Sequence, residues 1–419
     1  MKEVGADRFY EFKGMKKAPV LPPFYSTGQD MIYLDANATT RPDPQVMEAI
    51  LPYLTDVYGN ASSGHLLGRK ARKGLDKARS QVADMLKVSV EEIIFTSGAT
   101  ESINSVMSFV QREYPERPLL ITSTVEHEAV IECALRWEKL GGRVKRVAVD
   151  TQGRLDLEAL RAALEPGKTA LVSVIWANNE TGVITPLAEV AQLAHEAGAL
   201  VHADAAQMVG RLPVDLSSLA VDYLSLSAHK FHGLKGTGAL YVSRRVPFRP
   251  WILGGGQERG WRSGTENVTG IVALGLAAEK AAQRFTVGSH DSVARLRDAF
   301  EQRLVAEMPQ IVIHGQCAVR LPNTSSICLP EVDAAGMMIL LDQKGIACSG
   351  GSACQTVSLH PSHVLEAMGF SAEHAASTLR FSLSADTTEA ELMQAATQVI
   401  SLARHLCQQR DSLVRLSAT

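Results

Sequence analysis

The 419-residue sequence has no C-x-x-C pair, no long apolar run, no marked excess of charge of one sign, and no internal repeat or low-complexity segment. Its six cysteines therefore predict reduced thiols in a cytoplasmic protein, with no disulfide framework and no zinc or other metal site. No apolar run reaches the roughly 18 to 20 residues that span a bilayer, so no membrane segment is expected. The net charge of −3 gives no reason to expect direct nucleic-acid binding.

Residues 1–30 do not have the pattern of a signal peptide. They mix acidic and basic residues, and their apolar piece, 18–25, is interrupted by Pro19, Pro22 and Pro23. We expect a poorly ordered extension, with Met15 and Met31 as alternative starts. The length of 419 residues is enough to bury a large core and predicts about two or three domains.

From Glu91 onward, short β-rich runs alternate with amphipathic helical patterns. This alternation predicts βαβ units, a mostly parallel sheet and an α/β fold, in which ligands bind at the carboxyl ends of the strands. The predicted strands are Glu92–Phe95, Leu119–Thr122, Val144–Val149, Ala170–Ile175 and Ala199–His202. The predicted helices between them are Ala99–Val110, His127–Leu140, Leu157–Leu164 and Leu187–Ala197.

After Gly264 the pattern changes to one long helical region, Val268–Met308, followed by mixed elements. A strand-like run at Ser325–Leu329, a helix at Ala334–Gln343 and a small-residue loop at Cys348–Cys354 come first. A helix at Ser362–Met368, a strand at Leu379–Leu383 and a helix at Thr388–Gln408 follow. Such runs predict a smaller α+β domain with a helical linker.

The stretch from Val221 to Val242 places Lys230 in a polar, glycine-rich turn between two strand-like runs, Tyr223–Leu226 and Ala239–Val242. A lysine amine is the group that forms a Schiff base with a carbonyl cofactor, and the hydroxyl and glycines nearby suit a bound phosphate. On the local pattern alone, a β-hairpin with a solvated Lys230 is an equal alternative.

Four further turns follow predicted strands and carry polar groups. Thr96–Ser102 opens a helix whose free N–H groups suit a phosphate, although an ordinary helix cap explains it equally well. Val125–Glu128 carries His127, either a ring that stacks on a flat ligand or a helix cap. Ala177–Gly182 carries two amides and a carboxylate. His202–Gln207 carries Asp204, a buried charge that needs a partner such as a protonated pyridine nitrogen. With Lys230, the set predicts pyridoxal 5'-phosphate (PLP).

The chain resembles the cysteine desulfurases of the NifS/IscS type, in the class V aminotransferase family of PLP-dependent fold type I enzymes. The resemblance covers about residues 31 to 400 and implies a large PLP-binding domain at 39–288. It implies a small domain made of 31–38 and 289–419, with 1–30 as the extension. The matching stretches are Tyr33–Thr40, Gly59–Ser62, Phe95–Ser102, Asn178–Glu180, His202–Asp204, Ser227–Lys230, Gly254–Arg259, Arg262–Thr265, Gly351–Cys354 and Leu379–Ser382.

The resemblance implies a role for each matching site residue. Lys230 is the Schiff-base lysine, Asp204 pairs the ring nitrogen, and His127 stacks on the ring. The ring's phenolic oxygen is contacted by Asn179 and Gln207. The phosphate is bound by Ala99, Thr100, Ser227 and His229, and by Thr265 from the second subunit of a homodimer. The substrate carboxylate is held by Arg380 as a bidentate fork, with help from Asn37 and Asn178.

The implied activity removes sulfur from L-cysteine to give L-alanine and a persulfide on Cys354, which passes to a sulfur-acceptor protein. The acceptor loop belongs to the family's long-loop group. Selenocysteine lyase needs the same residues, and a PLP-bearing scaffold for acceptor proteins is an alternative of another class. The sulfur's destination stays open between iron–sulfur cluster assembly, tRNA thiolation, DNA phosphorothioation and cofactor synthesis.

Three features depart from the family pattern. Leu234 stands where a proline is usual, and residues 1–30 have no counterpart. Cys348 is an added thiol close to Cys354, for which we favour an inert, buried role over one in which it resolves the persulfide as a disulfide. Cys133, Cys328 and Cys407 are expected to be small buried side chains.

Overall fold

The computed structural model describes residues 31–350 and 361–417. Residues from Ile32 onward form one compact unit. Our expectation for residues 1–30 and our assignment of Cys354 both lie outside the described residues. No helix in the described part of the chain is long and apolar enough to cross a membrane.

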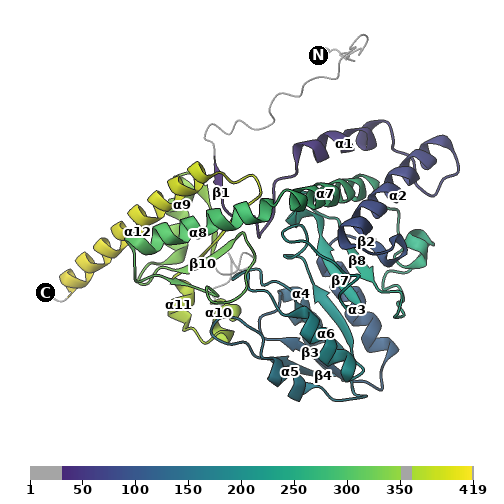
Figure 1. The fold of residues 1–419 in the computed structure, drawn as a ribbon, viewed down its shortest axis with the longest axis horizontal. Coiled ribbons are helices and arrows are strands. Elements are labelled where there is room, and N and C mark those ends of the chain that lie inside the picture. The colour runs from purple at the N-terminus through teal and green to yellow at the C-terminus, as the bar shows by residue number, and fades with distance from the viewer. Residues whose placement is uncertain (1–30, 351–360, 418–419) are drawn as a thin grey trace, which may run out of the picture. The chain divides into compact units, whose positions relative to one another are not determined.

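A seven-stranded sheet carries the elements that bear the predicted turns (Figure 1). Its order is β2-β8-β7-β6-β5-β3-β4, and only β8 runs against its neighbours. The mostly parallel sheet is therefore confirmed, and its strands match the predicted ones to within two residues. The strands are β2 (Ile93–Thr96), β3 (Leu119–Ser123), β4 (Arg143–Val147), β5 (Thr169–Ile175), β6 (Leu200–Asp204), β7 (Tyr223–Ser227) and β8 (Gly238–Val242).

Helices cover both faces of this sheet because successive side chains of a strand point to opposite faces. Ile94 and Leu120 belong to a core cluster with α3 (Ala99–Glu113) and α4 (Glu128–Lys139). Phe95 and Ile121 belong to the core on the other face, together with residues of α2, α5, α6 and α7. The bounds of these four helices are Leu66–Leu86, Leu157–Ala163, Leu187–Glu196 and Val268–Thr286.

A second core lies under a four-stranded antiparallel sheet of order β12-β13-β10-β9. Its strands are β9 (Val312–Ile313), β10 (Thr324–Cys328), β12 (Ser349–Gly350) and β13 (Thr378–Ser382), and helices α8 (Ser289–Glu307), α9 (Ala334–Gln343) and α12 (Glu389–Ser417) pack with it. The early residues Ile32 and Leu34 also belong to this core. They reach it because β1 (Ile32–Tyr33) pairs in parallel with β11 (Ile346–Ala347).

The structure differs from the sequence predictions in three respects. The expected single helical region 268–308 is two helices, α7 and α8, which are separated at Gly288 with φ of 67°. The small-residue loop predicted at Cys348–Cys354 follows β11 directly and contains β12 near its start. Three helices were not predicted: α1 (Pro44–Thr55), α2 and the short α11 (Ala372–Ala376). The predicted helix near 362–368 is present as α10 (His363–Ala367).

Candidate active site

The predicted site turns meet at one edge of the large sheet. β2 and β7 both run against β8, so they run in the same direction, and β3, β5 and β6 are parallel to β7. The carboxyl ends of all five strands therefore lie at the same edge. The predicted site residues lie at or just after these ends: Ala99 after β2, His127 after β3, Asn178 and Asn179 after β5, Asp204 at the end of β6 with Gln207 after it, and Ser227 at the end of β7 with His229 and Lys230 after it.

Lys230 lies in a short 3₁₀ turn, η2 (Ala228–Lys230), between two antiparallel strands. The hairpin interpretation was thus right for the backbone, but the side chain is half-buried rather than simply solvated. Its Nζ donates hydrogen bonds to the backbone oxygens of Asn37 at 2.7 Å and Ala38 at 3.0 Å. The amine therefore points toward the segment that enters from the second core.

The first turn of α3 forms a polar cradle with the end of β7. Gly98 caps this helix without a side-chain hydrogen bond, and the Ala99 N–H donates to the Ser227 Oγ at 2.8 Å. Thr100, next in the turn, is exposed. Strand β8 approaches so closely that a Cβ on Gly238 would lie 2.6 Å from the Gly98 Cα. A glycine is required there to keep the cradle closed.

His229 lies beside this cradle, and its Nδ1 is 3.1 Å from the Thr39 Oγ1. Burial, followed by the nearby charge of Lys230, lowers the pKa of this imidazole to about 4. The ring is therefore neutral near pH 7 and can donate one hydrogen bond to an anion.

Asp204 is buried at the end of β6, where its Oδ1 accepts a hydrogen bond from the Ala206 N–H at 3.0 Å. Burial raises the pKa of this carboxyl, and the charges of His127 and Lys230 oppose the rise. A cationic group placed against Asp204 would hold it ionised. His127 also caps α4, because its Nδ1 accepts from the Ala129 N–H at 3.1 Å. The helix-cap interpretation of His127 is thus confirmed.

Gln207 has one satisfied and one unsatisfied end. Its Nε2 donates to the Asn37 backbone oxygen at 2.9 Å. Its Oε1 is buried and has no hydrogen-bond partner among the described residues. Buried polar atoms are normally paired, so this oxygen indicates a missing ligand atom nearby.

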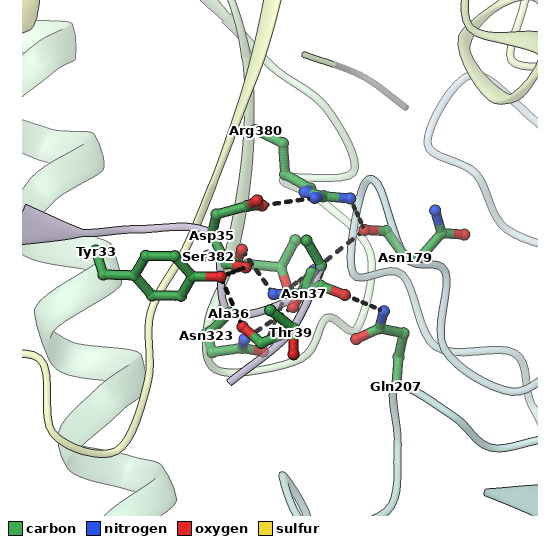
Figure 2. A network of polar contacts seen from close by, with 12 residues as sticks. Tyr33, Asp35, Ala36, Asn37, Thr39, Asn179, Gln207, Asn323, Arg380 and Ser382 are labelled. Atoms are coloured by element: carbon green, nitrogen blue, oxygen red, sulfur yellow. Dashed lines mark hydrogen bonds and ion pairs between the residues drawn. The ribbon is translucent and has the colours of Figure 1, made fainter. Parts of the chain in front are cut away.

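Arg380 joins the two cores at the site (Figure 2). It lies on β13 with 1% of its surface exposed. Its Nη2 donates to the Asp35 carboxylate at 2.8 Å, and its Nη1 donates to the Asn179 backbone oxygen at 3.0 Å. Its Nε is buried and has no partner within the described part of the chain. A substrate carboxylate would give that nitrogen a partner.

The amides of Asn37 and Asn178 are used within the protein. The Asn37 Nδ2 donates to the Asn179 backbone oxygen at 3.1 Å and to the Thr324 Oγ1 at 2.9 Å. The Asn178 Oδ1 accepts from the N–H groups of Glu180 and Thr181, at 2.9 and 3.0 Å. The Asn178 bonds shape the turn after β5, and the Asn37 bonds hold the segment that follows β1 against that turn. The predicted contacts of both residues with substrate stay predictions.

Thr265 does not join the cluster within this chain. It is exposed, in the loop between η3 (Gln257–Gly260) and α7.

Cys348 packs half-buried against the second core, and burial raises the pKa of its thiol to about 12. A thiol with such a pKa is a poor nucleophile, which supports the inert interpretation.

Three buried charged residues near the site were given no individual role from the sequence, and Glu180 was counted only as the carboxylate of its turn. Glu126 precedes His127, and its Oε1 accepts from Ser123 Oγ at 2.5 Å and from the Ile175 N–H at 3.0 Å. Glu180 accepts from Ser362 Oγ at 2.6 Å, and Arg211 donates to the Ala36 backbone oxygen at 3.0 Å. Glu126 and Glu180 lie inside two of the polar turns, so their positions in the sequence could have indicated that they belong to the site. No sequence pattern pointed to Arg211.

Comparison with known proteins agrees with this arrangement. The aminotransferase class-V family model matches residues 32–394. A cysteine desulfurase of Sinorhizobium fredii (strain NBRC 101917 / NGR234) is 46% identical over 382 residues, which are 90% of this chain and 98% of that protein. A solved NifS-like protein has a TM-score of 0.84 and 38% identity, covering 90% of this chain and 100% of that one. The structure of SspA in complex with cysteine has a TM-score of 0.75 and 32% identity, covering 85% and 99%.

The chain therefore belongs to the aminotransferase class-V family. Within that family, its similarity to a protein named cysteine desulfurase extends over nearly the whole of that relative. The predicted resemblance and the α/β fold are thereby confirmed.

Proposed function

We propose that the protein is a PLP-dependent cysteine desulfurase, which converts L-cysteine to L-alanine and holds the sulfur as a persulfide on Cys354. The observation that carries the proposal is the meeting of Lys230, Asp204 and the Ala99–Ser227 cradle at one sheet edge, with Arg380 entering from the other core. Similarity to proteins named cysteine desulfurase supports the same activity.

The described residues fit PLP. The orphaned Gln207 Oε1 suits the cofactor's phenolic oxygen if that oxygen is protonated, or the Gln207 amide suits it in the flipped orientation. Asp204 would pair the ring nitrogen and His127 would stack on the ring, with Asn179 beside it. The phosphate would be bound by Ala99, Thr100, Ser227 and His229. When bound, PLP supplies an electron sink for the negative charge that develops at the substrate Cα.

The chain's own residues then perform the remaining tasks. Arg380 orients the substrate by its carboxylate. Lys230, whose amine lies at the same sheet edge, would take the proton from the substrate Cα. The Cys354 thiolate bonds to the substrate sulfur as the Cβ–S bond breaks. The electron pair of that bond stays with carbon, Cβ gains a proton, and alanine leaves while the persulfide remains.

The assembly we propose is a homodimer in which Thr265 completes the phosphate site of the other subunit. Its exposure in the loop after η3 supports this role.

We also propose that the chain divides into a large domain, 39–288, and a small domain made of 31–38 and 289–419, which the two separate cores support. A cytoplasmic location is supported by the five described cysteines being free thiols. The persulfide would pass to an acceptor protein.

Turnover of L-cysteine by the purified protein tests the proposal. We expect equal amounts of alanine and of sulfane sulfur, with the sulfur found on Cys354 by peptide mass spectrometry. Cys354→Ser should retain PLP but form no persulfide, because a serine hydroxyl is not ionised near neutral pH. Faster turnover of selenocysteine with no persulfide on Cys354 would instead identify a selenocysteine lyase, and no turnover of either would leave the scaffold.

A further inference from the structure

Apart from Thr265, the residues of the segment Gly254–Thr265 have no role in the site described above. The segment nevertheless contacts strand β2 and the first turn of α3, next to the phosphate cradle. Strand β2 is an edge strand, so its outer N–H and C=O groups lack a neighbouring strand. The strand leads directly into Ser97, Gly98 and the first turn of α3. Whatever holds its outer edge therefore also fixes the cradle.

Glu258 holds that edge. Its Oε2 accepts from the Phe95 N–H at 2.8 Å, and its carboxylate pairs with Arg79 at 2.6 and 2.8 Å. Arg79 and Arg259 in turn donate to the Ile93 backbone oxygen at 2.8 and 2.7 Å. Glu258 and Arg259 both adopt left-handed backbone conformations, with φ of 47° and 60°. This conformation is unfavourable for residues other than glycine, so their contacts with the edge strand must stabilise it.

Arg262 holds the helix turn that follows. Its Nε and Nη2 donate to the two carboxylate oxygens of Glu101 at 2.9 and 3.2 Å. Glu101 is the third residue of α3, and its Oε2 also accepts from the Ser97 N–H at 2.8 Å. Burial opposes its ionisation, but hydrogen bonds from Arg262 and Ser97 bring the pKa of this carboxyl below its usual value. The first turn of α3 thus already holds a carboxylate.

The negative charge of Glu101 affects whether the same helix turn can bind a second anion, such as a phosphate. A helix N-terminus favours negative charge, but two anions in one turn repel each other unless one is neutralised. Arg262 is the cation that neutralises Glu101. With Arg262 in place, the turn can accept a phosphate.

We propose that Arg262 and Glu258 are positioning residues for the phosphate cradle: Glu258 fixes strand β2 and Arg262 cancels the charge of Glu101. The proposal rests on the proposed function, because the phosphate in question is that of PLP. Neither residue is one of the proposed phosphate ligands, so the effect would reach the phosphate through Phe95, Ser97 and Glu101.

Binding of PLP and of pyridoxal, which lacks the phosphate, to the cofactor-stripped full-length chain tests this. Arg262→Gln should weaken PLP binding about tenfold, the size of a charge effect at a partly buried helix N-terminus. Pyridoxal binding should change less than about twofold, because it places no charge in the cradle. Glu258→Gln should likewise weaken PLP more than pyridoxal.

A double variant separates charge from folding. Arg262→Gln with Glu101→Gln should recover most of the lost PLP affinity, and added salt should reduce the deficit of Arg262→Gln. The matched control is Arg143→Gln, which breaks a bidentate pair with Glu165 (2.9 and 2.7 Å) on the opposite edge strand, β4. It should leave both affinities unchanged.

Equal weakening of PLP and pyridoxal by Arg262→Gln would show a general structural role and overturn the proposal. PLP binding by Arg262→Gln equal to that of Arg143→Gln would overturn it as well, while leaving the proposed function intact. A wild-type chain that bound no PLP would overturn both.

Discussion

Arg380 enters the site with two of its three guanidinium nitrogens engaged by Asp35 and by the Asn179 backbone oxygen. Burial holds it in one orientation, which leaves the Nε for a ligand. The proposed recognition of a carboxylate here would therefore depend on the planar, many-pronged shape of arginine rather than on its charge alone.

Arg380→Lys is accordingly not a conservative change. A lysine cannot reach Asp35, Asn179 and a substrate carboxylate together. We therefore expect kcat/KM to fall by an amount that corresponds to a loss of about 2 kcal/mol or more of transition-state stabilisation. Steady-state kinetics with L-cysteine measure it. Arg404→Lys, which alters an exposed pair with Glu307, is the control and should have no effect. Unchanged efficiency of Arg380→Lys would remove Arg380 from the substrate site.

Lys230 makes a second prediction at the scale of one residue. Its amine is directed by the carbonyls of Asn37 and Ala38 to the same edge as Asp204. Lys230→Ala should lose the covalent link to PLP and the near-visible absorbance of that link. Borohydride reduction and peptide mass spectrometry of the wild type locate the link. Cofactor mass on any other lysine would contradict the assignment.

How far the sequence could reach differs from residue to residue. Lys230, Asp204 and Gln207 lie after strong strand patterns, so their convergence follows from the parallel sheet. The burial of Asn37 against the Asn179 turn joins residues 142 positions apart, and no local pattern reports such a contact. For that reason its structural bonds were not foreseen.

At the scale of elements, strands with flanking turns were predictable, while helices that precede the first clear strand were not. Helix α2 buries Ala71, Leu75, Ala78 and Val82 on one face, which is a helical spacing. The many lysines and arginines between them and the small size of alanine weakened that signal. The break at Gly288 also needed the structure, since one glycine does not by itself end a helix.

The junction of β3 and β5 makes a prediction about pH. Glu126 joins the ends of these strands, and burial raises the pKa of its carboxyl to about 8, with the charge of Asp204 adding to the rise. The unfolded chain releases this proton near its ordinary pKa of 4.5. The folded chain therefore binds more protons between these values, and stability falls as pH rises through that window.

Glu126→Gln should remove this loss. The amide oxygen can accept the same hydrogen bonds, so the variant should match the wild type near pH 5 and exceed it by at least about 1 kcal/mol near pH 9. Urea unfolding of both proteins at the two pH values measures the difference. Glu138→Gln, on the exposed side of α4, is the control. A gap that does not widen with pH would contradict the assigned ionisation of Glu126.

At the scale of the whole molecule, the proposed dimer can be tested by mixing variants. Neither Lys230→Ala nor Thr265→Ala homodimers have a complete site. In a mixed dimer, the subunit with Thr265→Ala keeps its own Lys230 and receives Thr265 from the other subunit. We expect that site to bind PLP as tightly as the wild type does. Differently tagged subunits and a PLP titration measure this, and no recovery in the mixed dimer would place Thr265 elsewhere.

The pairing of β1 with β11 sets an order of events during protein synthesis. Asp35 is among the first of the described residues to leave the ribosome, but its partner Arg380 is made 345 positions later. The strands of the seven-stranded sheet all precede residue 243. This sheet can therefore form before the first segment, which contains β1 and Asp35, pairs with β11 and Arg380. Since the Lys230 amine is directed by the backbone oxygens of Asn37 and Ala38 in that first segment, Lys230 reaches its final surroundings only when translation is nearly complete. A nascent chain arrested before β13 would thus have a folded sheet and an unfinished candidate site.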